Sequence, residues 1–118
     1  MARRDKGLQK YSVQESQNAG LGQAGCMFVD TNTAIVAPTG SAFVAITFLT
    51  DVTLDATVGL VAEDSSTWAN TAAAANPSDA TGGVIIDASN TFPKGVTIYG
   101  RWSSINLDST GTLIAYIG

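Results

Sequence analysis

Two runs of the sequence are apolar at nearly every position, and they restrict the possible folds more than any other feature. Residues 42–49 read AFVAITFL and residues 113–117 read LIAYI. A β-strand with one face in water alternates polar and apolar side chains, and neither run does. We therefore predict strands whose outer face is also buried, either by a second layer or by another subunit. For so small a body we favour a homo-oligomer.

Turn signals separate these two runs from other β-prone segments. Pro38-Thr39-Gly40 marks one turn, and residues 108–111 form a hairpin-like turn before the last strand. No helical periodicity competes with this pattern. The expected strands are residues 26–30, 33–37, 41–49, 57–62, 83–87, 96–102 and 112–117. The sequence thus predicts an all-β fold, an antiparallel β-sandwich or small β-barrel, for residues 25–118.

Charge divides the chain into a basic N-terminal arm and an acidic body. The first ten residues have a net charge of +3, and the remaining residues have −7. Residues 11–25 are rich in Gln, Ser and Gly, so we expect residues 1–24 to form an extended arm that is disordered alone. A basic arm suits an acidic protein surface. The candidate partner-binding residues of the arm are Arg3, Arg4, Lys6 and Lys10.

Composition narrows the class of protein. Charged residues make up 14% of the 118 residues, against roughly 25% in an average soluble domain. No apolar run approaches the ~20 residues that span a bilayer, and the basic N-terminus lacks the apolar stretch of a secretory signal. We therefore predict no membrane partner. The single cysteine, Cys26, excludes an internal disulfide, and its apolar neighbours indicate a small buried side chain.

The residues for catalysis are missing. The chain has no histidine, which removes the commonest general base and metal ligand, and one cysteine cannot build a zinc site. Asp51 with Asp55, and Glu63 with Asp64, lack calcium-loop spacing and are interpreted as solvated turn residues. An acidic body without interleaved basic and aromatic residues argues against nucleic acid. We predict a protein that is not an enzyme and holds no metal or cofactor.

A long insertion interrupts the β pattern between residues 63 and 82. It consists of small and polar residues, and Trp68 is its only large side chain. Irregular loops of this length in compact domains are usually functional or bound at an interface. A surface loop pinned by a core tryptophan explains the same composition, so both interpretations stay open.

Residues 92–102, FPKGVTIYGRW, combine a tight turn with an aromatic strand. Pro93 and Gly95 favour the turn, and the residues after them favour extended structure. Gly100 indicates a bulge or a close backbone approach. The adjacent Arg and Trp are typical of an interface. The candidate residues for a subunit interface are Trp68, Tyr99, Arg101 and Trp102.

Residues 92–102, together with the final GTLIAYI of residues 111–117, resemble the end of small virion proteins of tailed bacteriophages. In those proteins a turn and a strand ending in Tyr-Gly-Arg precede a last hairpin strand. The resemblance is clear over this final part and looser over the rest of the β body. Such proteins include capsid decoration (cement) proteins, which commonly form trimers and use N-terminal arms to clamp neighbouring capsomers. The family has no catalytic residues.

The resemblance implies a function for the whole chain. We expect a phage capsid decoration protein on the virion surface that stabilises the assembled head by bridging major capsid protein subunits. Its implied partners are the major capsid protein and itself, as a homotrimer. The alternative is a head-fibre or tail knob protein, in which Trp68, Tyr99 and Trp102 would bind a host receptor or glycan. The number of copies per particle distinguishes the two.

Overall fold

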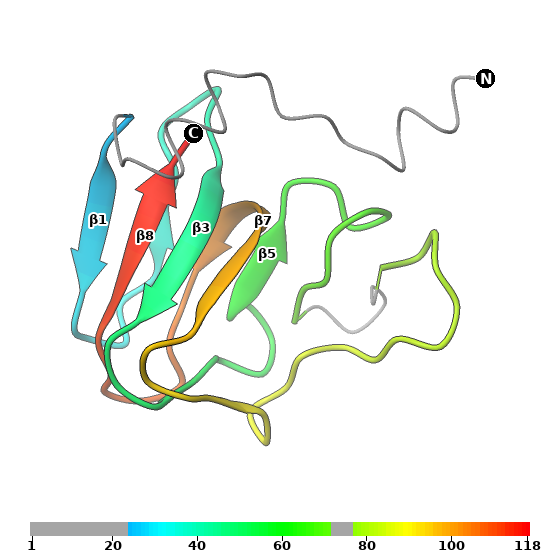
Figure 1. Ribbon diagram of the computed structural model, residues 1–118. Helices are drawn as coiled ribbons and strands as arrows, with labels where there is room; N and C mark the ends of the chain where they lie inside the picture. Colours follow the sequence, from blue (N-terminus) through cyan, green and yellow to red (C-terminus); the bar gives the residue numbers. More distant parts are fainter. Residues whose placement is uncertain (1–23, 72–76) are drawn as a thin grey trace.

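The computed structural model describes residues 24–71 and 77–118, and every regular element within them is a β-strand (Figure 1). All strand pairs are antiparallel. The strands are β1 (Cys26–Val29), β2 (Ile35–Val36), β3 (Phe43–Phe48), β4 (Val52–Thr53), β5 (Leu60–Ala62), β6 (Thr91–Phe92), β7 (Thr97–Ile105) and β8 (Leu113–Ile117). The predicted all-β fold is confirmed: the large sheet curls into a half-barrel, consistent with a small sandwich or barrel.

The large sheet is organised around β7, its longest strand. Its strand order is β1-β8-β3-β7-β2, and β5 also pairs with β7. Trp102 lies opposite Phe43 of β3 and opposite Ala62 of β5, so these two strands lie along opposite edges of β7. Strand β2 meets the far end of β7, where Ile35 is opposite Ile105. One long strand therefore holds three shorter ones in place.

Bulges in the middle of the sheet explain its curl. Between Phe43 and Ala45 the register of β3 shifts against both β7 and β8. Over the same interval β7 runs from Trp102 to Tyr99 and thus has one residue more than β3. A bulge bends its strand and increases the local twist. The bulge that the sequence predicts at Gly100 is therefore confirmed.

The close contact at Gly100 is made by a side chain, that of Trp102, rather than by another stretch of backbone. A Cβ atom on this residue would lie 2.7 Å from the Cη2 atom of Trp102. The indole ring therefore occupies the space that any other side chain at position 100 would need. Glycine at this position lets Trp102 pack flat over its own strand and into the core.

The core lies on the concave side of the sheet. Phe43, Ile46 and Phe48 of β3 are completely buried there. Full burial of a side chain of this size contributes roughly 1.5–3 kcal/mol relative to an exposed one. The other buried members of the core are Val29, Val52, Leu54, Leu60, Trp102, Ile105, Leu107, Leu113 and Ala115. This cluster combines residues from the start and from the end of the β region, and it holds the curled sheet together.

A second, two-stranded sheet adds a further layer at the end of β3. Its strands β4 and β6 place Val52 opposite Phe92. The ring of Phe92 stacks on that of Phe48, with centroids 4.9 Å apart and planes 15° from parallel. A bridge between Leu54 and Leu107 continues this layer along the core.

Two strand predictions need correction. Residues 83–87 are not a strand, because they form no ladder. Instead, Ile86 packs against the core and its backbone N–H donates to the carbonyl of Asn70. Strand β7 continues past the predicted end to Ile105, because β5 and β2 provide partners for its last residues. In residues 24–71 and 77–118 no helix is long and apolar enough to cross a membrane.

Candidate interaction surface

The convex side of the large sheet carries an uncharged surface. Residues directly opposite each other on antiparallel strands point to the same side. The registers therefore define two rows across β1, β8, β3 and β7. The first row is Phe28, Ile114, Thr47 and Thr97, and the second is Cys26, Tyr116, Ala45 and Tyr99. We call these eight residues the outer face; none of them belongs to the core cluster.

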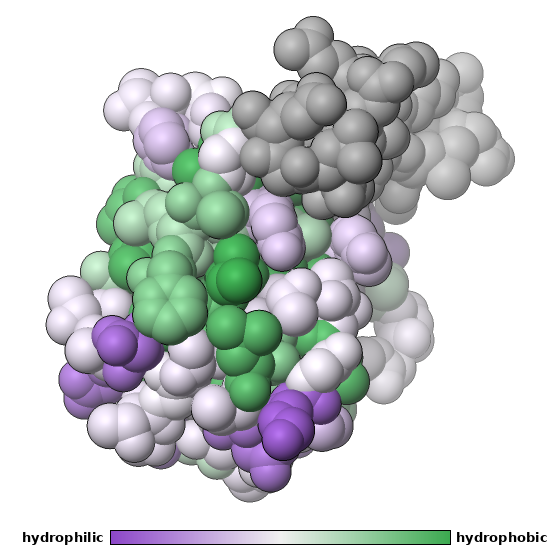
Figure 2. Space-filling model, turned by 60° about the vertical axis from the view of Figure 1, so that its left-hand side comes forward, coloured by the Kyte–Doolittle hydropathy of each residue, from purple (hydrophilic) through white to green (hydrophobic). Residues whose placement is uncertain are grey.

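The most exposed side chains of the outer face lie at its two margins. Phe28 on β1 is 64% exposed and Tyr99 on β7 is 68% exposed. Ile114 and Tyr116 of β8 lie between them and are half-buried. Figure 2 shows hydrophobic residues gathered on the side of the molecule that carries β1, with strongly hydrophilic ones below them. Large aromatic groups are thus open to solvent at both margins of the outer face, whereas Ala45 of β3 between them is buried.

Cys26 also belongs to this surface, which corrects the interpretation of its side chain as buried. Alternation along β1 points Met27 and Val29 toward the core, so Cys26 and Phe28 face outward. The thiol of Cys26 is exposed. The apolar sequence around this cysteine obscured the alternation, because both faces of β1 are apolar.

The threonines of the outer face lie opposite each other on β3 and β7. The hydroxyls of Thr47 and Thr97 are hydrogen-bonded to each other, with their oxygens 2.8 Å apart. A hydrogen bond within the face meets part of the bonding capacity of these hydroxyls, which lowers the cost of removing them from water. The outer face is therefore chemically suited to burial against another apolar surface.

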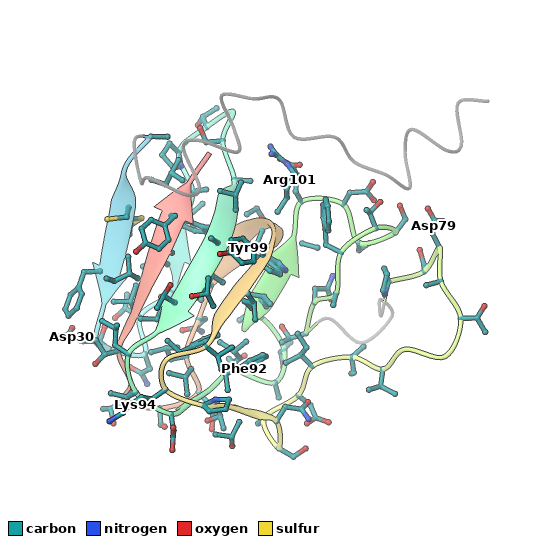
Figure 3. All side chains as sticks on the ribbon, viewed as in Figure 1. Asp30, Asp79, Phe92, Lys94, Tyr99 and Arg101 are labelled. Carbon is teal, nitrogen blue, oxygen red and sulfur yellow. The ribbon has the colours of Figure 1, made fainter. Side chains whose placement is uncertain are left out.

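Four charged residues lie together at one end of the sheet, away from the outer face. In antiparallel strands the end of β1 and β3 coincides with the start of β8 and β7. Asp30 follows β1, Asp51 follows β3, Asp108 precedes β8 and Lys94 precedes β7. There the Asp51 carboxylate accepts a hydrogen bond from the backbone N–H of Lys94, at 2.9 Å. Figure 3 shows Asp30 and Lys94 at this end, away from Tyr99.

The sequence singled out Arg101 and Trp102 for an interface, and the structure places both inside one chain. The side chain of Arg101 is 11% exposed and forms a two-point ion pair with Glu63, with Nε–Oε1 and Nη2–Oε2 distances of 2.7 and 3.3 Å. Trp102 is 4% exposed, and its indole N–H donates to the carbonyl of Ala69 at 2.9 Å. Their role between subunits stays a prediction, because both side chains expose little surface to a partner.

These contacts fasten the first part of the insertion to the sheet. Thr71 is buried, and its hydroxyl accepts a hydrogen bond from Leu60 N at 2.8 Å. Trp68 is half-buried, and its backbone N–H donates to the carbonyl of Asp64. The main anchor of the segment is therefore Trp102 of β7 rather than Trp68. Of the four interface candidates, Tyr99 alone lies on the outer face.

The basic residues of the arm, Arg3, Arg4, Lys6 and Lys10, lie outside the described residues. Phe28, Ile114 and Tyr116 were not singled out by the sequence. Alternation within residues 26–29 and 113–117 could have identified them. It is recognised only once the intervening residues of each strand are known to enter the core.

The acidic residues of the described part show turn chemistry. Hydrogen bonds from the backbone N–H groups of Val58 and Thr57 lower the pKa of Asp55. Hydrogen bonds from the hydroxyl and then the backbone N–H of Ser89 lower the pKa of Asp87. Within residues 24–71 and 77–118 no group of three acidic or cysteine side chains is arranged to hold a metal ion.

Comparisons with known proteins add no family to this description. Searches against protein-family models, curated proteins and solved structures find no match to the chain.

Proposed function

We propose that this chain is a structural protein of a phage virion that binds the assembled head and stabilises it by bridging major capsid protein subunits. The observation that carries the proposal is the outer face, an uncharged apolar surface that spans four strands. The resemblance of residues 92–102 and 111–117 to small virion proteins supplies the biological setting. The homotrimer that this resemblance implies stays a prediction.

The outer face supports an assembly role because it offers contact area and no reactive group. Monomeric proteins rarely leave a broad apolar patch in water, and such patches commonly mark protein interfaces. Phe28 and Tyr99 would be its principal anchors, since aromatic side chains bury a large area with little loss of conformational entropy. Aromatic residues are also enriched in the energetically dominant part of interfaces.

Stabilisation of the head then follows from linkage. A protein that binds only the assembled lattice lowers the free energy of that lattice relative to its separated subunits. Many weak contacts per particle add to this effect through multivalency. The arm, with Arg3, Arg4, Lys6 and Lys10, would contribute by reaching an acidic surface on a neighbouring subunit.

The alternative, a receptor- or glycan-binding knob on a fibre or tail, rests on an aromatic platform of Trp68, Tyr99 and Trp102. The indole of Trp102 packs in the core and Trp68 is half-buried, so the three side chains do not present one open surface. Counting the chain in particles separates the two functions. Decoration requires copies over the whole shell, whereas a knob is confined to fibres or the tail.

Co-sedimentation with phage heads assembled without this chain tests the proposal. We expect the full chain to bind, and we expect Tyr99→Lys to reduce the bound fraction at least about tenfold, because a charge buried in an apolar contact costs more than about 1.4 kcal/mol. The matched control is Val84→Lys, which places the same charge at a residue 79% exposed in the loop before β6.

The control should bind as the unmodified chain does. Equal binding by Tyr99→Lys and the unmodified chain would remove the outer face from the proposal. Failure of the unmodified chain to bind heads would remove the decoration function itself. A chain lacking residues 1–24 measures the separate contribution of the arm, which we expect to weaken with added salt.

A further inference from the structure

Strand β1 is the margin of the large sheet (Figure 1), and among the described residues it pairs with β8 alone. Ile117 N donates to the carbonyl of Gly25 at 2.9 Å. Backbone groups of successive residues alternate between the two edges of a strand, so Gly25, Met27 and Val29 face β8. The N–H and C=O groups of Cys26, Phe28 and Asp30 therefore face away from the sheet.

This open edge lacks the features by which proteins usually protect one. Edge strands are commonly blocked by lysine, proline, a bulge or an inward-pointing charge. The sequence of β1, Cys-Met-Phe-Val, contains none of these residues, and its pairing with β8 runs without a register shift. The edge is consequently a regular template for another extended strand.

We infer that β1 pairs with β1 of a second copy of this chain, antiparallel and centred on Phe28. In this register the outward backbone groups of Cys26, Phe28 and Asp30 meet those of Asp30, Phe28 and Cys26 of the second copy. Each outward group thus finds a partner, and the two Phe28 side chains lie opposite each other on the convex side. The contact obeys two-fold symmetry and joins two outer faces into one surface.

Charge placement makes a second copy a suitable occupant of this edge. Asp30 is the one charged residue among residues 24–30 of the described chain, and the register sets it opposite Cys26 rather than opposite another acid. The two Asp30 residues are four positions apart along the paired strands, or about 14 Å at about 3.4 Å per residue. This separation exceeds the Debye length of about 8 Å at physiological salt, so the like charges are largely screened.

The inference stands apart from the proposed head-binding function, because it concerns the free protein, and there it competes with the homotrimer that the resemblance implies. Light scattering on the full chain should give twice the chain mass of 12.1 kDa. Phe28→Lys and Phe28→Glu should each be monomeric, since each puts like charges face to face across the two-fold axis. An equimolar mixture of these two variants should recover the dimer, because lysine then faces glutamate.

The control is Val84→Lys, which should remain dimeric, and circular dichroism confirms that each variant is folded. A monomeric unmodified chain would overturn the inference, as would a mass three times that of one chain, since a self-paired strand cannot build a trimer. A dimer that survives Phe28→Lys would place the contact elsewhere. Failure of the mixed variants to associate would overturn the register centred on Phe28.

Discussion

Gly100 shows how one missing side chain allows another to enter the core. The indole of Trp102 lies over the Cα atom of Gly100, fills the core and donates to the carbonyl of Ala69. The sequence predicted an irregularity at Gly100 because glycine interrupts a run of good strand formers. It did not predict that the adjacent Arg101 and Trp102 face the chain's own insertion, because the position of Glu63 and Ala69 beside β7 is a tertiary property.

Gly100→Ala should therefore destabilise the fold. Its Cβ would lie 2.7 Å from the indole, and overpacking of this kind costs about 1–3 kcal/mol. Chemical denaturation measures the change in the free energy of unfolding. The same substitution in a Trp102→Val background should cost much less, because the ring that it meets is gone. Equal costs in the two backgrounds would contradict this packing.

The turn aspartates predict the response of stability to acid. Asp55 and Asp87 have folded-state pKa values below 3.8, the ordinary value. A lowered pKa means that these residues contribute fully to the free energy of unfolding above pH 3.8. This contribution is lost as pH falls through the lower, folded-state pKa. Thermal melting should therefore show declining stability below about pH 4. Asp55→Asn with Asp87→Asn should flatten this decline, and an unchanged acid profile would exclude these two turns as its source.

At the scale of elements, the sheet is more accurately predictable than its edges. The long apolar runs became β3 and β8, in which one face enters the core and the other belongs to the outer face. Residues 83–87 have the composition of a strand but no partner strand to form a ladder. The sequence alone does not reveal whether a partner is present. The apolar runs predicted that the sheet has a second face that needs burial. Assigning Phe28 and Tyr116 to that face required the register of the strands.

The two-fold pairing of β1 makes a specific covalent prediction. In the register centred on Phe28, position 30 lies opposite Cys26 of the second copy, with Cα atoms about 5.5 Å apart, within the range of disulfides. Asp30→Cys should therefore form a covalent dimer on mild oxidation, visible on non-reducing gels. Asp108→Cys adds a thiol away from the β1 edge and should remain without a cross-link. Equal cross-linking of both variants would indicate random collision rather than strand pairing.

At the scale of the molecule, charge and apolar surface are separated. The described acidic residues lie in turns and loops, the outer face is uncharged, and most of the basic residues lie in the first ten positions. Composition predicted this division between arm and body, whereas the structure identified the outer face as the exposed apolar surface. A protein built in this way offers one apolar surface and one basic arm, which suits attachment to a large assembly.

The central claim is that the outer face is buried when the chain is in its particle, and the single cysteine reports on it directly. Cys26 is exposed in the free chain and belongs to the outer face. We predict that a thiol reagent labels Cys26 at least about tenfold more slowly in intact heads than in the free protein, because a contact there excludes the reagent. Equal labelling rates in free protein and intact heads would contradict the account.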